Sequence, residues 1–372
     1  MRSSEGVYFS KLDHVRGLAA YLVFVWHFHH LTRPDLYEKT APAPFPLALL
    51  HESHTGVALF MTLSGFLFAK IVGGRELHVA PFWFNRMLRL APLLIVSFGL
   101  AALCAKWLGS APVTWNLLVS GLVLPTWPQG AWSIAVELHF YLLLPFLLLL
   151  ARRISPIALL GTVVCTIGLR TMLWLHFGEV HVWSYWTIVG RFDQFAFGMF
   201  FALMPFGARQ RAWIAALCGI AFLVFWQWFD AAGGYYDLQG QKAHSPVWII
   251  VPTCEGLAYG ALIAWYSGSA IQLPKALDAA LARIGTWSYS IYLLHFYFWI
   301  VLRRLTIGTL PDLSFVPSLL LATACFVAFL PVAAASFHFF ETYFLGFRVP
   351  YLSARDAMPD TASQAVSAGR AT

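Results

Sequence analysis

Long apolar runs, separated by short polar segments, recur from one end of the chain to the other. Eleven such runs fall at about residues 15–31, 54–72, 88–107, 112–126, 132–151, 154–176, 185–206, 212–229, 247–266, 285–302 and 316–344. A helix rises about 1.5 Å per residue, so most of these runs are long enough to cross the roughly 30 Å of hydrocarbon in a bilayer. The pattern therefore predicts an all-α fold, a polytopic bundle of membrane helices.

The composition supports a membrane protein. Of the 372 residues, 59% are hydrophobic and 11% are charged, and the mean hydropathy is +0.69. A soluble domain is about half apolar and about a quarter charged, so a soluble, disordered or nucleic-acid-binding protein is a poor interpretation. The net charge of +7 is explained by Lys and Arg in cytoplasmic loops. The five cysteines lie inside apolar runs at irregular spacing, so neither a disulfide framework nor a metal site is expected.

The distribution of Lys and Arg indicates which runs cross the membrane. The run at 112–126 is short and leads into the turn-forming segment 125–130. If this run dips into the membrane and returns, Arg152 and Arg153 lie inside, and 16 Lys and Arg are cytoplasmic, 6 are outside and 2 are within the membrane. This asymmetry follows the positive-inside rule. It predicts about ten transmembrane helices plus one re-entrant segment, with both termini in the cytoplasm.

This topology divides the chain into three parts. Residues 1–11 are expected to form a cytoplasmic N-terminal segment, residues 12–345 the transmembrane domain, and residues 346–372 a disordered cytoplasmic tail. The end of the tail is rich in Ala, Ser and Asp, a composition typical of disorder. Any chemistry is therefore expected within the membrane domain.

Several ionisable residues fall at membrane depth, where each costs about 3 kcal/mol on insertion scales. So many buried charges are typical of a polar cavity, although some can simply pair and fix helix packing, the interpretation that we favour for Arg170 taken alone. The residues are Arg16, His27, Glu137, His139, Arg170, Arg191, Asp193, Glu255 and His295.

Arg16 and His27 are expected to lie on one stripe of the first helix. Eleven residues separate them, which brings the helix round to within about 20° and raises it by about 16 Å. Arg16 then lies near the cytoplasmic edge and His27 in the outer half. A guanidinium suits a phosphate or a carbonyl oxygen, and a neutral imidazole can accept a proton from a hydroxyl group.

Glu137 is expected at the depth of His27, about 8 Å inside the outer edge of its helix. A carboxylate beside an imidazole can set its tautomer and raise its basicity. The alternative is that Glu137 pairs with Arg170 or Arg191.

Other local motifs are weak. Ser64 lacks the first glycine of a nucleophile elbow in residues 62–65, so we expect it to be a small packing residue. The two histidines of the segment His-Glu-Ser-His at 51–54 do not have the spacing of a zinc protease.

Five blocks, in this order along the chain, resemble those of the acyltransferase-3 family of bacterial integral-membrane O-acyltransferases. The first is Leu-Asp-His-Val-Arg-Gly-Leu-Ala-Ala at 12–20, closed by His27 as an R-x10-H element. The second and third are Gly-Val-Ala-Leu-Phe-Met-Thr-Leu-Ser-Gly-Phe-Leu at 56–67 and Phe-Asn-Arg-Met-Leu-Arg-Leu-Ala-Pro at 84–92. The last two are Trp-Ser-Ile-Ala-Val-Glu-Leu-His-Phe-Tyr at 132–141 and Gly-Thr-Trp-Ser-Tyr-Ser-Ile-Tyr-Leu-Leu-His at 285–295.

The chain departs from the family pattern at three positions. Ala58 stands where many members carry an acid, which affects the expected choice of acceptor. Asn85 stands where an Arg is common and Ile134 where Leu is usual, and both of these changes are expected to be tolerated.

The resemblance implies that the transmembrane domain, residues 12–345, transfers an acyl group, commonly acetyl, from cytoplasmic acyl-CoA to a hydroxyl group, often on a carbohydrate or a glycosylated acceptor. Arg16, Arg86 and Arg89 would form a basic mouth for the CoA phosphates. His27, Glu137 and Arg16 would be catalytic, with acyl-CoA as donor substrate and no bound cofactor. The expected location is the bacterial inner membrane, in contact with lipid and not with nucleic acid.

Two other classes of function remain open at this stage. A proton-coupled transporter could use the same buried charges as a relay, but it would often show matching halves with broken helices, which the sequence lacks. A non-catalytic scaffold has no need of a buried Arg and His on one helix face. The sequence does not identify the acceptor.

Overall fold

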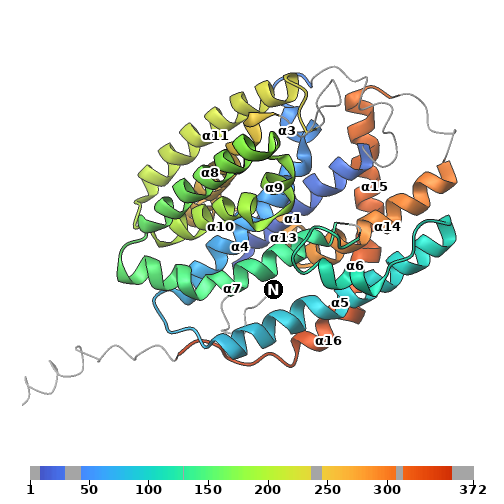
Figure 1. The fold of residues 1–372 in the computed structure, drawn as a ribbon, viewed down its shortest axis with the longest axis horizontal. Coiled ribbons are helices and arrows are strands. Elements are labelled where there is room, and N and C mark those ends of the chain that lie inside the picture. Colours follow the sequence, from blue (N-terminus) through green and yellow to red (C-terminus); the bar gives the residue numbers. More distant parts are fainter. Residues whose placement is uncertain (1–8, 30–42, 129, 236–244, 307–312, 354–372) are drawn as a thin grey trace, which may run out of the picture.

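The computed structural model describes residues 9–29, 43–128, 130–235, 245–306 and 313–353. These residues are almost entirely helical, with no strand in the described ranges beyond one isolated bridge between Leu77 and Leu352. Ten helices contain 16 or more residues (Figure 1): α1 Ser10–His27, α4 Gly56–Val72, α5 Val79–Leu108, α7 Trp132–Arg153, α8 Ala158–Phe177, α10 Ile188–Leu203, α11 Ala208–Ala231, α12 Val251–Gly268, α14 Ser288–Thr306 and α15 Phe315–Ser336. The predicted all-α class is confirmed.

Short helices connect or extend the long ones. They are α3 Ala48–His51, η2 Ser53–Thr55, α6 Trp115–Ser120, α9 His181–Trp186, η3 Pro246–Ile249, α13 Lys275–Thr286, the π-helical turn η4 Phe337–Glu341 and α16 Thr342–Leu345. By length and composition, six helices of the described chain are apolar enough to cross a membrane. The other four long helices of the described chain, α1, α10, α12 and α14, fall outside this set.

The fourth apolar run contains no helix long enough to cross a bilayer, and it turns back on itself. Its only helix, α6, has six residues and is therefore about 9 Å long. The chain then folds back on it, because Thr126 Oγ1 donates to the carbonyl of Leu117 at 2.9 Å and Trp127 Nε1 donates to that of Leu118 at 2.6 Å. As Figure 1 shows, α5 and α7 run in opposite directions on either side of this return. This geometry matches the predicted re-entrant segment.

The predicted cytoplasmic residues gather at one end of the bundle. Arg152, at the end of α7, donates to the carbonyl of Arg75, between α4 and α5. Lys11 Nζ donates to the carbonyl of Ser269 after α12, at 2.5 Å, and a side chain at Gly268 would contact the guanidinium of Arg211. We call this end the basic face.

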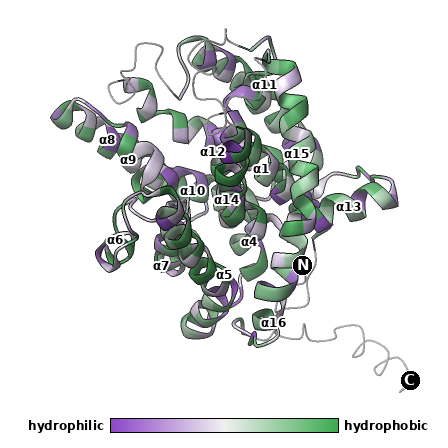
Figure 2. Cartoon of the chain, turned by 90° about the vertical axis from the view of Figure 1, so that its right-hand side faces the viewer, coloured by the Kyte–Doolittle hydropathy of each residue, from purple (hydrophilic) through white to green (hydrophobic). Residues whose placement is uncertain are grey.

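The bundle has an outer and an inner set of helices. Only 17% of the apolar windows of α8 and α11 is buried, whereas 72% of that of α4 is buried. Exposed apolar side chains such as Leu175 and Leu217 therefore lie on the outer surface of the bundle, and hydrophobic residues predominate along α5 and α15 (Figure 2). The inner helices α1, α4, α10 and α12 form the core.

Glycines allow the inner helices to approach closely. A Cβ atom at Gly65 of α4 would lie 2.2 Å from the carbonyl oxygen of Phe195 of α10, and one at Gly198 would lie 2.0 Å from that of Thr62. A Cβ at Gly285 would lie 1.8 Å from the carbonyl oxygen of Asp13. Glycine at these positions therefore lets α10 pack against α4, and α13 against α1, at backbone contact.

Candidate active site

A cavity lies within the basic face, between α1, α4, α5, α7, α14 and the segment after α16. Its volume is about 160 Å³. The polar and charged residues among its lining are Asp13, Arg16, Ser64, Arg86, Arg89, Ser133, Glu137, Tyr141, Ser288, Tyr289, Tyr292, Arg348 and Tyr351. Three helices that are distant in sequence thus bring together Arg16, Arg86, Arg89 and Glu137, four of the five residues that the sequence assigned to the site.

The arginines are held by specific contacts. Arg16 pairs with Asp13 one turn earlier on α1, at 2.7 Å, and Asp13 is buried. The guanidinium of Arg86 packs over the rings of Phe68 and Phe82, and its Nε is buried with no hydrogen-bond partner in the described part of the chain. A buried donor without an acceptor is costly, so this group is suited to bind an anion.

Arg89 is anchored from behind the cavity. Its guanidinium donates to Oε2 of Glu341 at 2.5 Å and lies over the ring of Tyr289. Glu341 ends the π-helical turn η4 and also accepts a hydrogen bond from Ser290 at 2.6 Å. A π-turn at this point rotates Glu341 toward α5, an arrangement that is frequent at functional sites.

The fourth arginine comes from the segment that the sequence assigned to a disordered tail. Residues 346–353 instead fold back against the start of α5. The amide of Asn85 donates to the carbonyl of Val349 at 2.7 Å and accepts from its backbone N–H at 3.0 Å. Arg348 and Tyr351 thereby enter the cavity lining. The departure at Asn85 from the family pattern thus has a structural role in this chain.

The cavity carries an excess of positive charge. Four guanidinium groups face only two carboxylates, those of Asp13 and Glu137, among its lining residues. Burial and the charges of Arg86 and Arg89 lower the pKa of Arg348. The cations therefore repel one another, and a polyanion bound between them would relieve this repulsion.

Glu137 of α7 lines the same cavity. Its Oε1 accepts hydrogen bonds from Tyr141 at 2.5 Å and from Ser64 at 3.2 Å. The prediction that Ser64 only packs is therefore wrong: Gly65 makes the close helix contact, and Ser64 on the next face points into the cavity.

The other intramembrane charges pair with each other. Arg170 and Asp193 form an ion pair at 2.7 Å with both side chains fully buried, and Arg191 lies 3.5 Å from Glu255. These pairs join α8, α10 and α12, as the packing interpretation of Arg170 predicts. Neither arginine is therefore the partner of Glu137.

His139 belongs to neither group. Its Nε2 lies 2.6 Å from the carbonyl oxygen of Leu122 and fastens the re-entrant segment to α7.

His27 lies beyond the cavity lining. Its Nδ1 is 2.8 Å from the carbonyl oxygen of Val23 and 3.0 Å from Nε2 of His295. One turn earlier on α14, Tyr292 does line the cavity, and its ring lies 6.0 Å from that of His295. His27 is thus connected to the cavity through α14, and no hydrogen bond joins it to Glu137 within the described residues.

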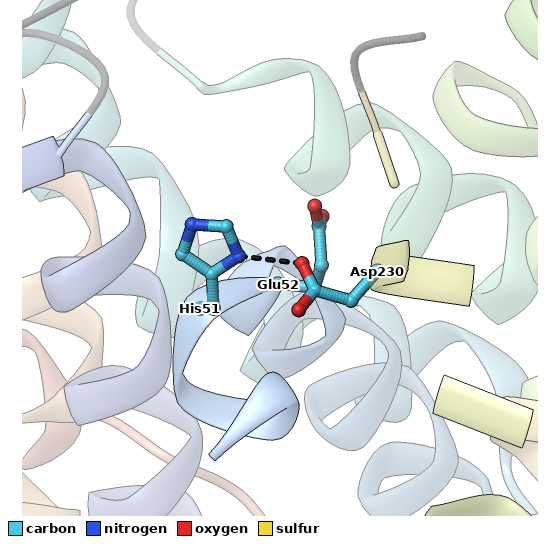
Figure 3. A group of neighbouring side chains, drawn as sticks. All are labelled: His51, Glu52 and Asp230. Atoms are coloured by element: carbon cyan, nitrogen blue, oxygen red, sulfur yellow. Dashed lines mark hydrogen bonds and ion pairs between the residues drawn. The ribbon is translucent and has the colours of Figure 1, made fainter. Parts of the chain in front are cut away.

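A second polar cluster lies at the opposite end of the bundle. His51, Glu52 and Asp230 offer ligand atoms within 4.8 Å of one another and could hold a metal ion (Figure 3). However, His51 Nδ1 already pairs with Oδ1 of Asp230 at 2.5 Å, and Oδ2 accepts from the backbone of Ala43 at 2.9 Å. Burial lowers the pKa of His51, but the hydrogen bond and charge of Asp230 outweigh it and raise the pKa above its ordinary value. The cluster is therefore explained as an ion pair between α3 and α11.

Sequence reasoning missed Arg348 and His295 as neighbours of the site residues. The sequence does contain an indication that the segment around Arg348 is packed against the bundle, because the apolar residues 349–352 follow it directly. The sequence identifies His295 only as one of the ionisable residues at membrane depth and as the last residue of the block at 285–295.

Two comparisons relate the chain to known proteins. A model of the acyltransferase-3 family, described as an acyltransferase domain, matches residues 9–338. The chain is also similar to acyltransferase MdmB of Streptomyces mycarofaciens, with 26% identity over 321 residues that cover 77% of each chain. No solved structure matches it.

Proposed function

The chain belongs to the acyltransferase-3 family and is a membrane acyltransferase, and from this premise we propose that it transfers an acyl group, acetyl in the simplest case, from acyl-CoA to a hydroxyl group of a carbohydrate or glycosylated acceptor. One observation carries the proposal. Four arginines converge on a cavity at the basic face, where a cytoplasmic acyl-CoA would arrive.

The CoA moiety supplies the negative charge that would balance the arginines of this cavity. Its phosphates are polyanionic, and guanidinium groups bind phosphate oxygens through paired, charge-assisted hydrogen bonds. Arg86 and Arg89 from α5 and Arg348 from the C-terminal segment line the cavity. Arg16 lies beside them on α1 and steadies the donor as its acyl arm extends along the helix toward His27.

The chemical step takes place at the far end of that arm. His27 removes the proton from the acceptor hydroxyl, and the oxygen attacks the thioester carbonyl. The carbon–oxygen bond forms, the carbon–sulfur bond breaks, and the proton passes from His27 to the departing thiolate. Glu137 provides a negative charge near the Tyr292 end of the cavity, which offsets the charge of the imidazolium.

The acceptor reaches His27 from the end of the bundle opposite the basic face. Donor and acceptor then meet within the membrane, since Arg16 and His27 are separated by a helix rise of about 16 Å. This arrangement suits acylation of a glycan or glycoside at the bacterial inner membrane, with the donor kept on the cytoplasmic side.

Thiol release from acetyl-CoA by the purified, lipid-reconstituted protein tests the proposal. The wild type should release free CoA in the presence of a panel of carbohydrate and glycoside acceptors, and mass spectrometry should detect the acetyl ester of one of them. His27→Ala should lose about 10²–10⁴-fold in rate, as is typical when a general base is removed, and should still bind CoA.

Arg283→Ala is the matched control, because Arg283 is an exposed arginine of α13 that does not line the cavity. Its rate should equal that of the wild type. A His27→Ala protein with wild-type rate would refute the assignment of the base, and absence of CoA binding by the wild type would refute the donor.

A further inference from the structure

His27 and His295 face each other where α1 meets α14. Nδ1 of His27 lies 3.0 Å from Nε2 of His295, and their ring centroids are 4.7 Å apart. His295 is fully buried, whereas His27 is partly exposed. We propose that His295 is a positioning residue for acyl transfer, which holds His27 in the one tautomer whose Nε2 can take a proton. This inference rests on the proposed function.

Two backbone carbonyls determine where the ring protons are. Nδ1 of His27 lies 2.8 Å from the carbonyl oxygen of Val23, and Nδ1 of His295 lies 3.1 Å from that of Ile291. A carbonyl oxygen only accepts hydrogen bonds, so each Nδ1 must carry a proton. In two neutral imidazoles, both Nε2 atoms then carry lone pairs.

The hydrogen bond between the two rings therefore runs from His27 as donor to His295 as acceptor. The Nδ1–H of His27 is shared between the carbonyl of Val23 and the Nε2 of His295. With the proton on Nε2 of His295 instead, an unprotonated Nδ1 of each ring would face the carbonyl of Val23 or Ile291. Two pairs of opposed acceptors in a buried site are unfavourable, so this alternative is disfavoured.

This arrangement leaves Nε2 of His27 unprotonated and available to accept a proton from the acceptor hydroxyl. No hydrogen bond to its Nε2 occurs within the described residues, while Phe296 covers one side of the ring at a centroid distance of 4.2 Å. When Nε2 takes the hydroxyl proton, the ring becomes an imidazolium and its Nδ1–H bond to His295 becomes charge-assisted. His295 thus acts as the third member of a catalytic triad does, but as a neutral acceptor.

Glu137 does not occupy this position. Its carboxylate accepts from Ser64 and Tyr141, whereas the ring of His295 is fixed by Phe24 and Phe296 at centroid distances of 6.3 and 4.6 Å. The rigid neighbour of the proposed base is therefore a histidine of α14.

Three substitutions separate hydrogen bonding from packing. The side-chain amide of Gln can place an acceptor near the position of Nε2, and that of Asn can do so only near the position of Nδ1. His295→Gln therefore keeps the acceptor that faces His27, His295→Asn removes it at similar polarity, and His295→Leu removes both polar atoms.

The kinetic expectation is specific. In His295→Asn and His295→Leu, kcat should fall by about 10²-fold or more, whereas His295→Gln should stay within about tenfold of the wild type. The KM for acetyl-CoA should change little in all three, because His295 does not line the cavity that holds the arginines. In a His27→Ala background, His295→Leu should cause no further loss.

Equal losses in the Gln and Asn variants would overturn the inference, because they would indicate packing alone. A wild-type kcat in His295→Asn would also overturn it. If the His295→Leu protein does not fold, the kcat values of the Gln and Asn variants still distinguish hydrogen bonding from packing. His27→Ala distinguishes this failure from that of the proposed function. If His27→Ala is active, the base itself is wrong, and if it is inactive while His295→Asn is active, only the role of His295 is wrong.

Discussion

Replacing Arg348 with alanine should weaken the binding of CoA without making the empty protein less stable. One hydrogen bond to a charged group contributes about 1.5–3 kcal/mol, and about 1.4 kcal/mol corresponds to a factor of ten in affinity. The dissociation constant of CoA should therefore rise by about 10-fold to 150-fold. Arg348 is well suited to this test because it lines the cavity but lies outside the long helices, so its substitution leaves the helices intact.

The expectation for stability follows from the contacts of the C-terminal segment. Two hydrogen bonds from Asn85 to the backbone of Val349 hold this segment in place, and the Arg348 side chain is not part of them. The charges of Arg86 and Arg89 repel the Arg348 guanidinium, whereas the carboxylate of Glu341 attracts it, so the substitution removes a repulsion and an attraction together. Thermal unfolding of the empty variant should therefore begin at about the same temperature as in the wild type.

Titration calorimetry with CoA and thermal melting of the same detergent-solubilised sample measure both effects. Arg283→Ala, which removes an exposed charge from α13, should change neither. Asn85→Ala should weaken CoA binding without removing a charge, because it releases the segment that carries Arg348. Wild-type affinity in Arg348→Ala, or an equal loss in Arg283→Ala, would refute the view that the arginines form one phosphate site.

Two further predictions concern topology and pH. In a cysteine-free background, Arg153→Cys and Gly178→Cys should react with a membrane-impermeant maleimide from opposite sides, cytoplasmic and outer respectively; labelling of position 153 from outside would mean that the fourth apolar run crosses. The folded-state pKa of His51 is raised by Asp230, so its contribution to stability is complete below the unfolded pKa of about 6.5 and is lost as the pH rises through the folded value. Melting temperatures of the wild type should accordingly fall from pH 6 to pH 8.5 by more than those of His51→Gln, and parallel curves would contradict the ion pair.

The sequence by itself determined the features that depend on neighbouring residues. The length of each apolar run predicts whether a helix can cross a bilayer. The short run at 112–126 was expected to turn back because this places more Lys and Arg on the cytoplasmic side, and its residues do fold back on α6. The charges flanking those runs predicted the basic face and three arginines of its cavity. The spacing of Arg16 and His27 on one helix stripe is likewise a local property of α1.

Tertiary packing decided which of these groups are partners. By charge alone, Glu137 could pair with Arg170 or Arg191, but the packing of α8, α10 and α12 gives those arginines Asp193 and Glu255 instead. His27 meets His295, a residue 268 positions away in sequence. A hydrogen bond requires two atoms within about 3 Å, whereas the sequence pattern fixes a residue only to a helix face and a depth. The partner is therefore chosen by how helices distant in sequence pack together.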